Sequence, residues 1–499
     1  MNRRRFVQSS LAAAVAASLP ASQGLAAILS GSMGVDADIN AVTGDGAEVT
    51  LQRAAVTELG ESLRGNLVLP GHEVYEEARR ILNASINKHP ALIVQCKGVA
   101  DVKNAVDFAR ESNLLVAVKC GGHSFSGKST CDGGMMIDLT TLRSVRVDPK
   151  RRIANVSGGS LLGDMDHDTM AFGLVTTAGT VSHTGVGGLT LGAGFGRVGR
   201  RFGLALDNVL GLDIVTADGR VLRADPDENP ELYWGLRGGG GNFGVVTNFD
   251  FQLHPMDREV VGGTILFPMS EAKSVLNFLA DYAAEAPDEL YLDGGVTSGP
   301  GRPAAALLHI CYSGPMNKAD RLIDPIRKAG TPIFDGIQAM DYVALQRSGD
   351  TSDPRARGGY IKSGFTAEIT PEMIDDVLYG FKEDPVRGMT VYWQHAGGKI
   401  GRVDSDATAF AHRHVNHDTL MLLDWPVDID STPHVKWLKE YWATVEPHTR
   451  GAYANDIGDA PQDAVHRNYG GNYDRLLALK NQYDPGNLLR LNANIIPTA

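Results

Sequence analysis

Three glycine clusters carry the groups of this sequence that are best suited to bind a ligand. They are Gly121-Gly122-His123-Ser124, the run from Gly185 to Gly196, and the run from Gly238 to Gly244. Glycine lets the backbone approach a ligand closely, and successive exposed N–H groups form nests that bind anions. Of the 58 glycines, 26 lie between Gly121 and Gly244. Several such loops in one region suit a long ligand with a pyrophosphate in its middle.

The third cluster contains the spacing G-x-G-x-x-G, which is found in dinucleotide-binding domains. That fingerprint follows a strand, opens a helix and is followed by an acidic residue about 20 positions later. Here the alternating residues from Val245 to Leu253 predict a strand after the glycines, and the acidic residue is missing. We therefore interpret Gly238 to Gly244 as a loop that enters a strand.

Charge and cysteine content narrow the functional classes. The chain has 47 Lys and Arg against 59 Asp and Glu, a formal net charge of −12, which argues against nucleic acid as a partner. Its four cysteines form no C-x-x-C pair, so no metal site is predicted. Cys120 and Cys131 are the closest pair in sequence, and a disulfide and two buried thiols both remain open.

The N-terminus has the pattern of an export signal. Arg3-Arg4-Arg5-Phe6 precedes a small apolar run from Leu11 to Leu19, and Gly24-Leu25-Ala26 offers a cleavage site. The paired arginines favour a twin-arginine signal over residues 1–26, with an ordinary secretory signal as the alternative. We expect a linker or mature arm over 27–60 and no membrane span, because a span needs about 20 apolar residues.

The elements around the first loop form a strand–helix–strand unit. Apolar residues predict strands at 91–94 and 114–118, and helical spacing predicts a helix over 101–112. After Pro255 glycine becomes sparse and amphipathic helices begin, such as Ser270 to Ala284. This change indicates a domain boundary near Pro255.

The order of these motifs resembles the vanillyl-alcohol oxidase / p-cresol methylhydroxylase superfamily, and more closely its berberine-bridge-enzyme-like branch. The resemblance covers about His89 to Pro255 and about Asn468 to Pro497. In that family a G-G-H-S loop carries a histidine that is bonded to the flavin, which corresponds to His123. A second loop, A-G-T-C-x-x-x-G-V-G-G, is similar to Ala178 to Gly188. Val181 stands at the position of its cysteine, so the resemblance implies one covalent bond rather than two.

The resemblance implies FAD as the cofactor, attached covalently through His123. The residues that it places at the cofactor are Gly121, Gly122, His123, Ser124, Phe125, Gly127, Ala178, Gly179, Thr184, Gly185, Gly187, Gly188, Gly192, Val246 and Asn492. His183 would line the flavin or pack against its neighbours. The size of Thr184 favours an oxidase over a dehydrogenase.

Family enzymes place their base on the substrate-domain strands or near the C-terminal motif. The corresponding candidates are Tyr392 and Gln394, which share one face of a strand at 391–395, and Tyr469. A tyrosine needs a neighbouring cation or donor to lower its pKa from about 10 before it acts as a base. Packing is the alternative role for each tyrosine. The segment from Ala409 to Arg413 is interpreted as structural, with His412 or Arg413 satisfying buried carbonyls.

The fold implied is α+β, with a two-lobed PCMH-type FAD-binding domain over 61–257 and an inserted antiparallel-sheet substrate domain over 258–450. The berberine-bridge-like segment 451–499 returns to the FAD domain. The implied activity is hydride transfer from a small alcohol, sugar, amine or N-heterocycle to flavin N5, with molecular oxygen as the acceptor and H2O2 as a product. A dehydrogenase with another acceptor and a catalytically silent flavin-binding protein are the alternatives. The protein is expected to be periplasmic or secreted, and the sequence does not indicate its oligomeric state.

Overall fold

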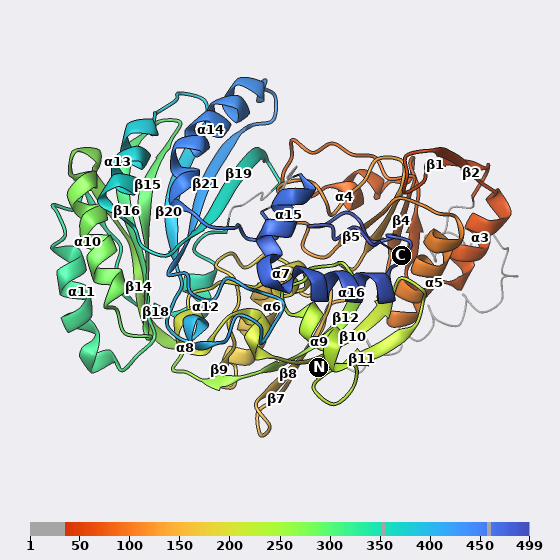
Figure 1. Ribbon diagram of the computed structural model, residues 1–499, viewed down its shortest axis with the longest axis horizontal. Helices are drawn as coiled ribbons and strands as arrows, with labels where there is room; N and C mark the ends of the chain where they lie inside the picture. Colours follow the sequence, from red (N-terminus) through yellow and green to blue (C-terminus); the bar gives the residue numbers. More distant parts are fainter. Residues whose placement is uncertain (1–34, 351–354, 457–460, 499) are drawn as a thin grey trace, which may run out of the picture.

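Three sheets of four, five and eight strands organise the chain (Figure 1). The computed structural model describes residues 35–350, 355–456 and 461–498. In Figure 1 the eight-stranded sheet and its helices form the left part, and the two smaller sheets form the right part. The expected export signal at 1–26 lies outside the described residues.

The four-stranded sheet has the order β3-β4-β6-β5 and carries the first glycine loop. Its strands are β3 (Asn66–Val68), β4 (Leu92–Gln95), β5 (Val116–Lys119) and β6 (Met135–Asp138). Helix α5 (Val99–Glu111) connects β4 to β5, and both strands run parallel to β6, which lies between them. The predicted strand–helix–strand unit is therefore observed, with β6 inserted at its centre.

Residues 35–60 are folded, so the expected linker or arm is wrong for this part of the chain. Strands β1 (Ile39–Val42) and β2 (Glu48–Leu51) form a hairpin, and α3 (Arg53–Ser62) follows it. Ala41, Leu51, Val56 and Leu59 pack in the same core as β4 and α5. The apolar runs in this part of the chain are short and interrupted by polar residues. The sequence pattern therefore did not predict these two strands and the helix.

The five-stranded sheet has the order β11-β10-β12-β8-β7 and is antiparallel. Its strands are β7 (Val145–Asp148), β8 (Ile153–Ser157), β10 (Val209–Thr216), β11 (Val221–Ala224) and β12 (Gly244–Gln252). Between its strands the chain forms α6 (Leu162–Met170), α7 (Val186–Gly192), α8 (Gly199–Phe202), η1 (Ala205–Asn208) and α9 (Pro230–Leu236), and β9 (Leu174–Val175) pairs with β13 (His254–Pro255). Helix α4 (Tyr75–Arg79) instead packs against β4 of the four-stranded sheet. Strand β12 begins at the end of the third glycine cluster, as predicted.

The eight-stranded antiparallel sheet begins directly after the predicted boundary. Its strands are β14 (Glu259–Pro268), β15 (Leu290–Gly299), β16 (Arg302–Tyr312), β17 (Phe334–Asp335), β18 (Gln338–Asp341), β19 (Arg357–Thr366), β20 (Gly388–His395) and β21 (His417–Pro426). The helices of this region are α10 (Ala272–Ala284), α11 (Ala319–Arg327), α12 (Tyr342–Gln346), α13 (Pro371–Gly380) and α14 (Thr432–Val445), with short turns η2 (Met269–Glu271), η3 (Met316–Lys318), η4 (Ile400–Arg402) and η5 (Glu446–His448).

The two faces of this sheet differ in chemistry. Leu292, Trp393 and Met421 lie on one face and form an apolar core with α10, α11, α13 and α14. Because side chains alternate along a strand, their neighbours lie on the opposite face. Asp293 and Gln394 belong to that opposite face, which is the polar side of the sheet.

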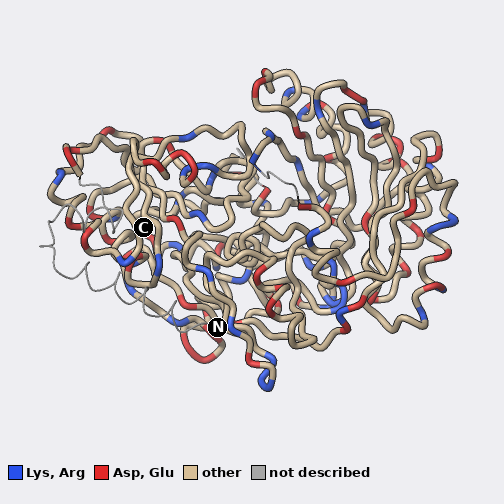
Figure 2. Tube along the Cα trace, turned by 180° about the vertical axis from the view of Figure 1, so that it is seen from behind, with Lys and Arg blue, Asp and Glu red and all other residues tan. Residues whose placement is uncertain are grey.

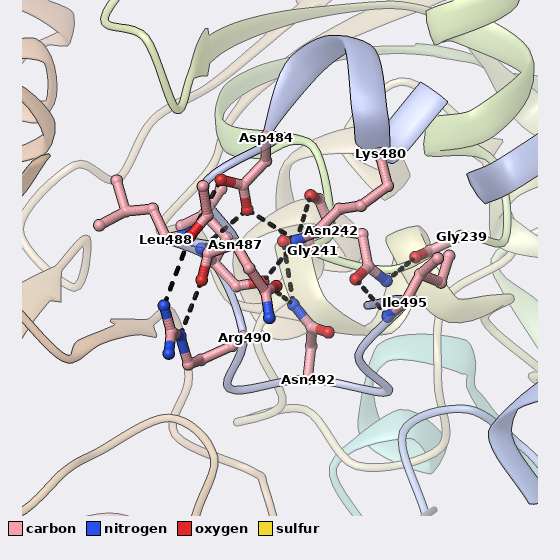
Figure 3. A network of polar contacts seen from close by, with 12 residues as sticks. Gly239, Gly241, Asn242, Lys480, Asp484, Asn487, Leu488, Arg490, Asn492 and Ile495 are labelled. Carbon is pink, nitrogen blue, oxygen red and sulfur yellow. Dashed lines mark hydrogen bonds and ion pairs between the residues drawn. The ribbon is translucent and has the colours of Figure 1, made fainter. Parts of the chain in front are cut away.

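The C-terminal segment returns to the glycine loops. It forms α15 (Gln462–Tyr469), η6 (Gly470–Asn472) and α16 (Tyr473–Tyr483), which lie with the right part in Figure 1. The ammonium of Lys480 in α16 is fully buried and donates to the Asp484 carboxylate at 2.6 Å, to Asn242 O at 3.1 Å and to Leu489 O at 3.0 Å (Figure 3). This network ties the segment to the third glycine cluster.

Acidic and basic residues alternate along both parts of the molecule (Figure 2). Within the described residues no helix has the length and apolar composition needed to cross a bilayer.

Candidate functional site

The first and second glycine loops touch through their backbones. A Cβ atom on Gly121 would lie 2.3 Å from the Gly185 nitrogen, and one on Gly185 would lie 2.3 Å from the Gly121 nitrogen. Any larger residue at either position would therefore force the loops apart. This contact places His123 against the loop that contains Thr184.

His123 is held between two polar side chains. Its Nε2 lies 2.6 Å from His183 Nδ1, and its Nδ1 lies 3.2 Å from Thr184 Oγ1. Burial, and to a smaller degree the neighbouring His183, lowers the pKa of His123 to about 3. The imidazole is therefore neutral at physiological pH and keeps a nitrogen lone pair, which a nucleophile or covalent cofactor ligand requires.

The loop around His183 is fixed by a residue that follows α12. Asp350 accepts hydrogen bonds from the backbone N–H and the hydroxyl of Ser182. Burial lowers the pKa of His183, and the charge of Asp350 opposes that shift. Asp350 is 168 positions from Ser182, so no local pattern could have revealed it.

The other predicted residues of the first loop face the same region. Gly122 and Gly127 have φ values of 69° and 74°, which glycine adopts without strain. The Ser124 hydroxyl accepts from the Lys128 N–H at 3.0 Å, and Phe125 accepts at its carbonyl from Asn83.

The second loop leads into α7. A Cβ on Gly187 would lie 3.0 Å from Gly158 O, whereas one on Gly188 would meet no atom within 4 Å. Gly179 O accepts from Gln346 Nε2 at 2.9 Å. Gly188 thus has open space above it, where a ligand can lie against the backbone.

Tight backbone contacts also surround three further predicted cofactor residues. A Cβ on Gly196 would lie 1.6 Å from Ala178 O, one on Gly158 would lie 2.3 Å from Val246 O, and one on Gly192 would lie 2.7 Å from Asn455. Ala178 and Val246 are buried. Gly158 therefore lies beside both Gly187 and Val246, which joins the second loop to β12.

Asn492 connects the C-terminal segment to the third glycine cluster (Figure 3) and to Lys128, four positions after Ser124. Its amide donates to Gly241 O at 3.2 Å, and its backbone oxygen accepts from Lys128 Nζ at 2.8 Å. These contacts join segments of the chain that are far apart in sequence, from Lys128 through Gly241 to Asn492.

This region contains buried polar atoms without a partner among the described residues. They are Ser129 Oγ, Thr130 Oγ1, Thr190 Oγ1, Asn492 Oδ1 and Asn494 Oδ1. An unpaired buried polar atom costs about 1–3 kcal/mol. A ligand rich in hydroxyl, phosphate and ring N–H groups would satisfy them, so these residues fit FAD.

The polar sheet face contributes Tyr392 and Gln394, as predicted from the alternation of the strand. Gln394 Nε2 donates to the Tyr291 hydroxyl at 3.3 Å, and that hydroxyl donates to Asp293 Oδ2 at 2.6 Å. Burial raises the pKa of Asp293 to about 7.

Tyr392 has no lowered pKa. Burial raises the pKa of its hydroxyl well above the usual value, and the charges of Asp293, Asp418 and Asp456 act in the same direction more strongly than Arg197 opposes them. Tyr392 therefore stays a neutral phenol at physiological pH. The surrounding charges therefore disfavour a tyrosinate base at Tyr392.

Arg197 connects the sheet face to the histidine loop. The buried guanidinium donates to His309 Nε2 at 3.1 Å, to Thr180 O at 3.0 Å and to Gln346 Oε1 at 2.6 Å. His309 lies on β16 directly opposite Asp293. The polar face is therefore fixed next to the loop that contains His183.

Tyr469, which the sequence offered as a possible base, instead has a structural environment. Its hydroxyl lies 3.4 Å from Gly239 O and 3.3 Å from Ala493 O, which accept its hydrogen bond. Burial raises its pKa, and its ring packs in the core with Phe243 and Leu476. Tyr469 thus stabilises the third glycine cluster.

The segment from Ala409 to Arg413 is structural, as expected. His412 Nε2 contacts Asn468 O at 2.7 Å, while Arg413 binds both carboxylate oxygens of Asp207 at 2.8 Å. Cys120 and Cys131 are free thiols in the structure.

Comparisons with known proteins identify the family of this chain. A family model described as "FAD binding domain" matches residues 90–225, and one described as "Berberine and berberine like" matches residues 452–496. An FAD-linked oxidoreductase of Dictyostelium discoideum is 34% identical over 448 residues, covering 89% of this chain and 97% of the relative. The (R)-6-hydroxynicotine oxidase of Paenarthrobacter nicotinovorans is 30% identical, covering 87% and 97%.

The fold is similar as well. The crystal structure of 6-hydroxy-D-nicotine oxidase from Arthrobacter nicotinovorans superposes with a TM-score of 0.80 at 27% identity, covering 87% of this chain and 98% of the other. Together the glycine loops, the C-terminal segment and these similarities show that the chain belongs to the berberine-bridge-enzyme-like FAD-linked oxidoreductases of the vanillyl-alcohol oxidase / p-cresol methylhydroxylase superfamily.

Proposed function

We propose that this protein is an exported oxidase that holds FAD covalently through His123 and oxidises a CH–OH or CH–NH group of a small substrate with molecular oxygen. The neutral, buried imidazole of His123 carries the proposal for covalent attachment. A protonated histidine has no lone pair with which to bond a carbon atom. Its tight packing between His183 and Thr184 also fixes the ring before any bond forms.

The bound FAD would supply an acceptor for the substrate hydride. Ser129, Thr130 and Asn492 would hold polar groups of the cofactor, because their side chains offer buried atoms without another partner among the described residues. Tyr392 and Gln394 would orient the substrate by hydrogen bonds from the sheet. The (R)-6-hydroxynicotine oxidase relative supports N-heterocycles as one substrate class, and the polar sheet face supports hydroxylated compounds as another.

Oxygen as the acceptor is favoured by Thr184, whose modest side chain adjoins His123. Export is favoured by the paired arginines at Arg3 and Arg4. A dehydrogenase and a silent flavin protein remain the competing functions, and each makes a different experimental prediction.

Covalent attachment is tested by acid precipitation of the purified protein and of His123→Ala. We expect yellow colour to stay with the wild-type pellet and to move to the supernatant for the variant. The control is His412→Gln, because this half-buried histidine also makes a hydrogen-bond contact through Nε2, but to a backbone carbonyl on a different segment. Colour that remains in the His123→Ala pellet would refute the assignment.

The activity is tested by mixing the wild-type holoenzyme anaerobically with a panel of oligosaccharides, benzylic alcohols and hydroxylated N-heterocycles. Bleaching of the flavin by one compound, followed by H2O2 formation in air, is expected for an oxidase. Bleaching without rapid reoxidation by oxygen would identify a dehydrogenase, and no bleaching across the panel would favour the silent protein.

Export is tested by fractionating a bacterial host that has a twin-arginine system. The yellow protein should be recovered outside the cytoplasm, and Arg3→Lys together with Arg4→Lys should retain it inside. Equal export of both forms would contradict the twin-arginine proposal.

A further inference from the structure

Two carboxyl groups meet beneath the polar sheet face without a basic partner among the described residues. Asp418 lies on β21, directly opposite Gln394 on β20, and is 1% exposed. Both of its carboxyl oxygens lack a hydrogen-bond partner in the described part of the chain, and so does Asp456 Oδ2. Asp456 comes from the C-terminal segment and is half-buried.

The backbone explains how these two residues meet. Arg450 pairs with Phe365 on β19, which brings the chain that follows it over the sheet. Phe365 lies opposite Asp418 in the sheet. Ser363, on the same face as Phe365, lowers the pKa of Asp456 and so offsets part of the rise that burial causes. The C-terminal segment thereby places Asp456 near Asp418 and Gln394, which lie opposite each other on β21 and β20.

The groups that face this pair are mostly acidic or neutral. Asp293 approaches from β15, Tyr392 from β20 and Tyr453 from the C-terminal segment. Arg197 is the cation whose charge reaches Tyr392 and Asp293. Burial raises the pKa of Asp418 well above its usual range, and the charges of Asp456 and Asp293 raise it further. Burial likewise raises the pKa of Asp456.

Because the charge of Asp456 raises the pKa of the buried Asp418, the two groups do not both ionise at low cost, and one of them keeps a proton. The more deeply buried Asp418 keeps it, because burial disfavours its charged form most. Asp456 is then the carboxylate of the pair. Its Oδ2 is buried and has no partner among the described residues, so it can accept a proton from a group that enters the sheet face.

We propose that Asp456 is the base that takes the hydroxyl proton of the substrate, that Asp418 positions and tunes it, and that the substrate is accordingly an alcohol or sugar. This inference rests on the proposed oxidase or dehydrogenase function. In the step, the substrate carbon would lose its hydrogen together with both bonding electrons, and the bound flavin would supply the two-electron acceptor. The substrate O–H bond breaks, its proton goes to the Asp456 carboxylate, and the carbon–oxygen bond becomes a carbonyl.

The shared proton is tested first, without any substrate. Infrared titration of the FAD-loaded wild-type protein should show a protonated carboxyl band that persists above the pH range near 7 in which Asp166 and Asp293 titrate, and Asp418→Asn should remove that band. The matched control is Asp424→Asn on the same strand, whose carboxylate pairs with Arg357 near the surface and should leave the band unchanged. A band that persists in Asp418→Asn, or that is absent from the wild type, would overturn the assignment of the proton.

The base is tested by anaerobic flavin bleaching with the alcohol or sugar that reacts in the panel. We expect Asp456→Asn to slow bleaching about 10²–10⁴-fold, the usual contribution of a general base, while its flavin content stays at the wild-type level. Asp418→Asn should leave the acid limb of the rate profile near its wild-type pH, because Asp418 is the protonated, neutral member of the pair, whereas a charged Asp418 would raise the pKa of Asp456 and its loss would shift the limb to lower pH.

The outcomes separate this inference from the proposed function. Bleaching of the wild type together with an unchanged rate and pH profile in Asp456→Asn would overturn the base while keeping the enzyme. Bleaching only by amines would overturn the substrate class. Failure of the wild type to bleach with any compound would contradict the proposed function and also the base, while the infrared titration would still decide whether Asp418 holds the proton.

Discussion

The buried ion pair between Lys480 and Asp484 provides the sharpest test of how the C-terminal segment holds the glycine loops. The two side chains are 0% and 1% exposed, and their 2.6 Å contact is accompanied by bonds from Lys480 to Asn242 O and Leu489 O. Lys480→Met removes the cation and leaves the Asp484 carboxylate in the core. Loss of one partner from such a pair costs about 3–5 kcal/mol.

We expect the stability cost of Lys480→Met to lie at the lower end of that range. Asp484 keeps hydrogen bonds from the N–H groups of Leu488 and Leu489, at 2.8 Å and 2.9 Å, so its charge is partly compensated in the variant. We therefore expect a loss of about 3 kcal/mol. For a domain of about 200 residues this lowers the melting temperature by roughly 6–12 °C.

A second lysine offers a matched control. Lys436 and Glu440 have the same spacing on α14, but their side chains are 77% and 66% exposed. Lys436→Met should cost less than about 1 kcal/mol, because solvent screens an exposed pair. Differential scanning calorimetry of the FAD-loaded proteins measures both effects.

A mutant cycle shows whether the interaction itself is responsible. Adding Asp484→Asn to Lys480→Met should cost less than the sum of the single changes, since the uncompensated charge is then removed. A Lys480→Met transition within about 1 °C of that of Lys436→Met, a shift much smaller than the roughly 2–4 °C expected per kcal/mol, would refute the reasoning.

Two further predictions concern the loops and a buried carboxyl. Gly185→Ala places a Cβ 2.3 Å from Gly121 N, so the amount of covalently bound flavin in acid-precipitated protein should fall sharply. The control Gly471→Ala should retain its flavin, because no atom lies within 4 Å of the added Cβ. Equal flavin contents in the two variants would contradict this prediction. Burial raises the pKa of Asp166 to about 7, so its contribution to stability is fully present below about pH 4 and is lost as the pH rises to 7. Relative to wild type, Asp166→Asn should therefore gain on the order of 4 kcal/mol in unfolding free energy between pH 4 and pH 8, measured by urea titration, and a difference independent of pH would exclude the shift.

The glycine loops of the site could be predicted from the sequence because their residues lie in short contiguous motifs. Glycines that must pack backbone to backbone, such as Gly121 and Gly185, cannot be replaced without displacing a loop. The alternation that placed Tyr392 and Gln394 on one face is likewise a local property of a strand.

The catalytic carboxyl groups could not be predicted in the same way. Asp418 and Asp456 become neighbours only because Arg450 pairs with Phe365, which is a tertiary contact between distant segments. An isolated aspartate in a strand or loop has no distinguishing pattern. Tyr469 shows the reverse error, since its conspicuous neighbours Gly470 and Gly471 are part of a structural turn rather than a substrate site.

The mass of the intact denatured protein tests the central claim most directly. Wild-type protein purified with its bound flavin should be heavier than its own polypeptide, allowing for removal of the export signal, by one FAD less two hydrogens, and peptide mapping should localise the addition to the fragment that contains His123. His123→Ala should show the mass of the polypeptide alone. A wild-type mass without the addition, or an addition on a fragment without His123, would contradict the account.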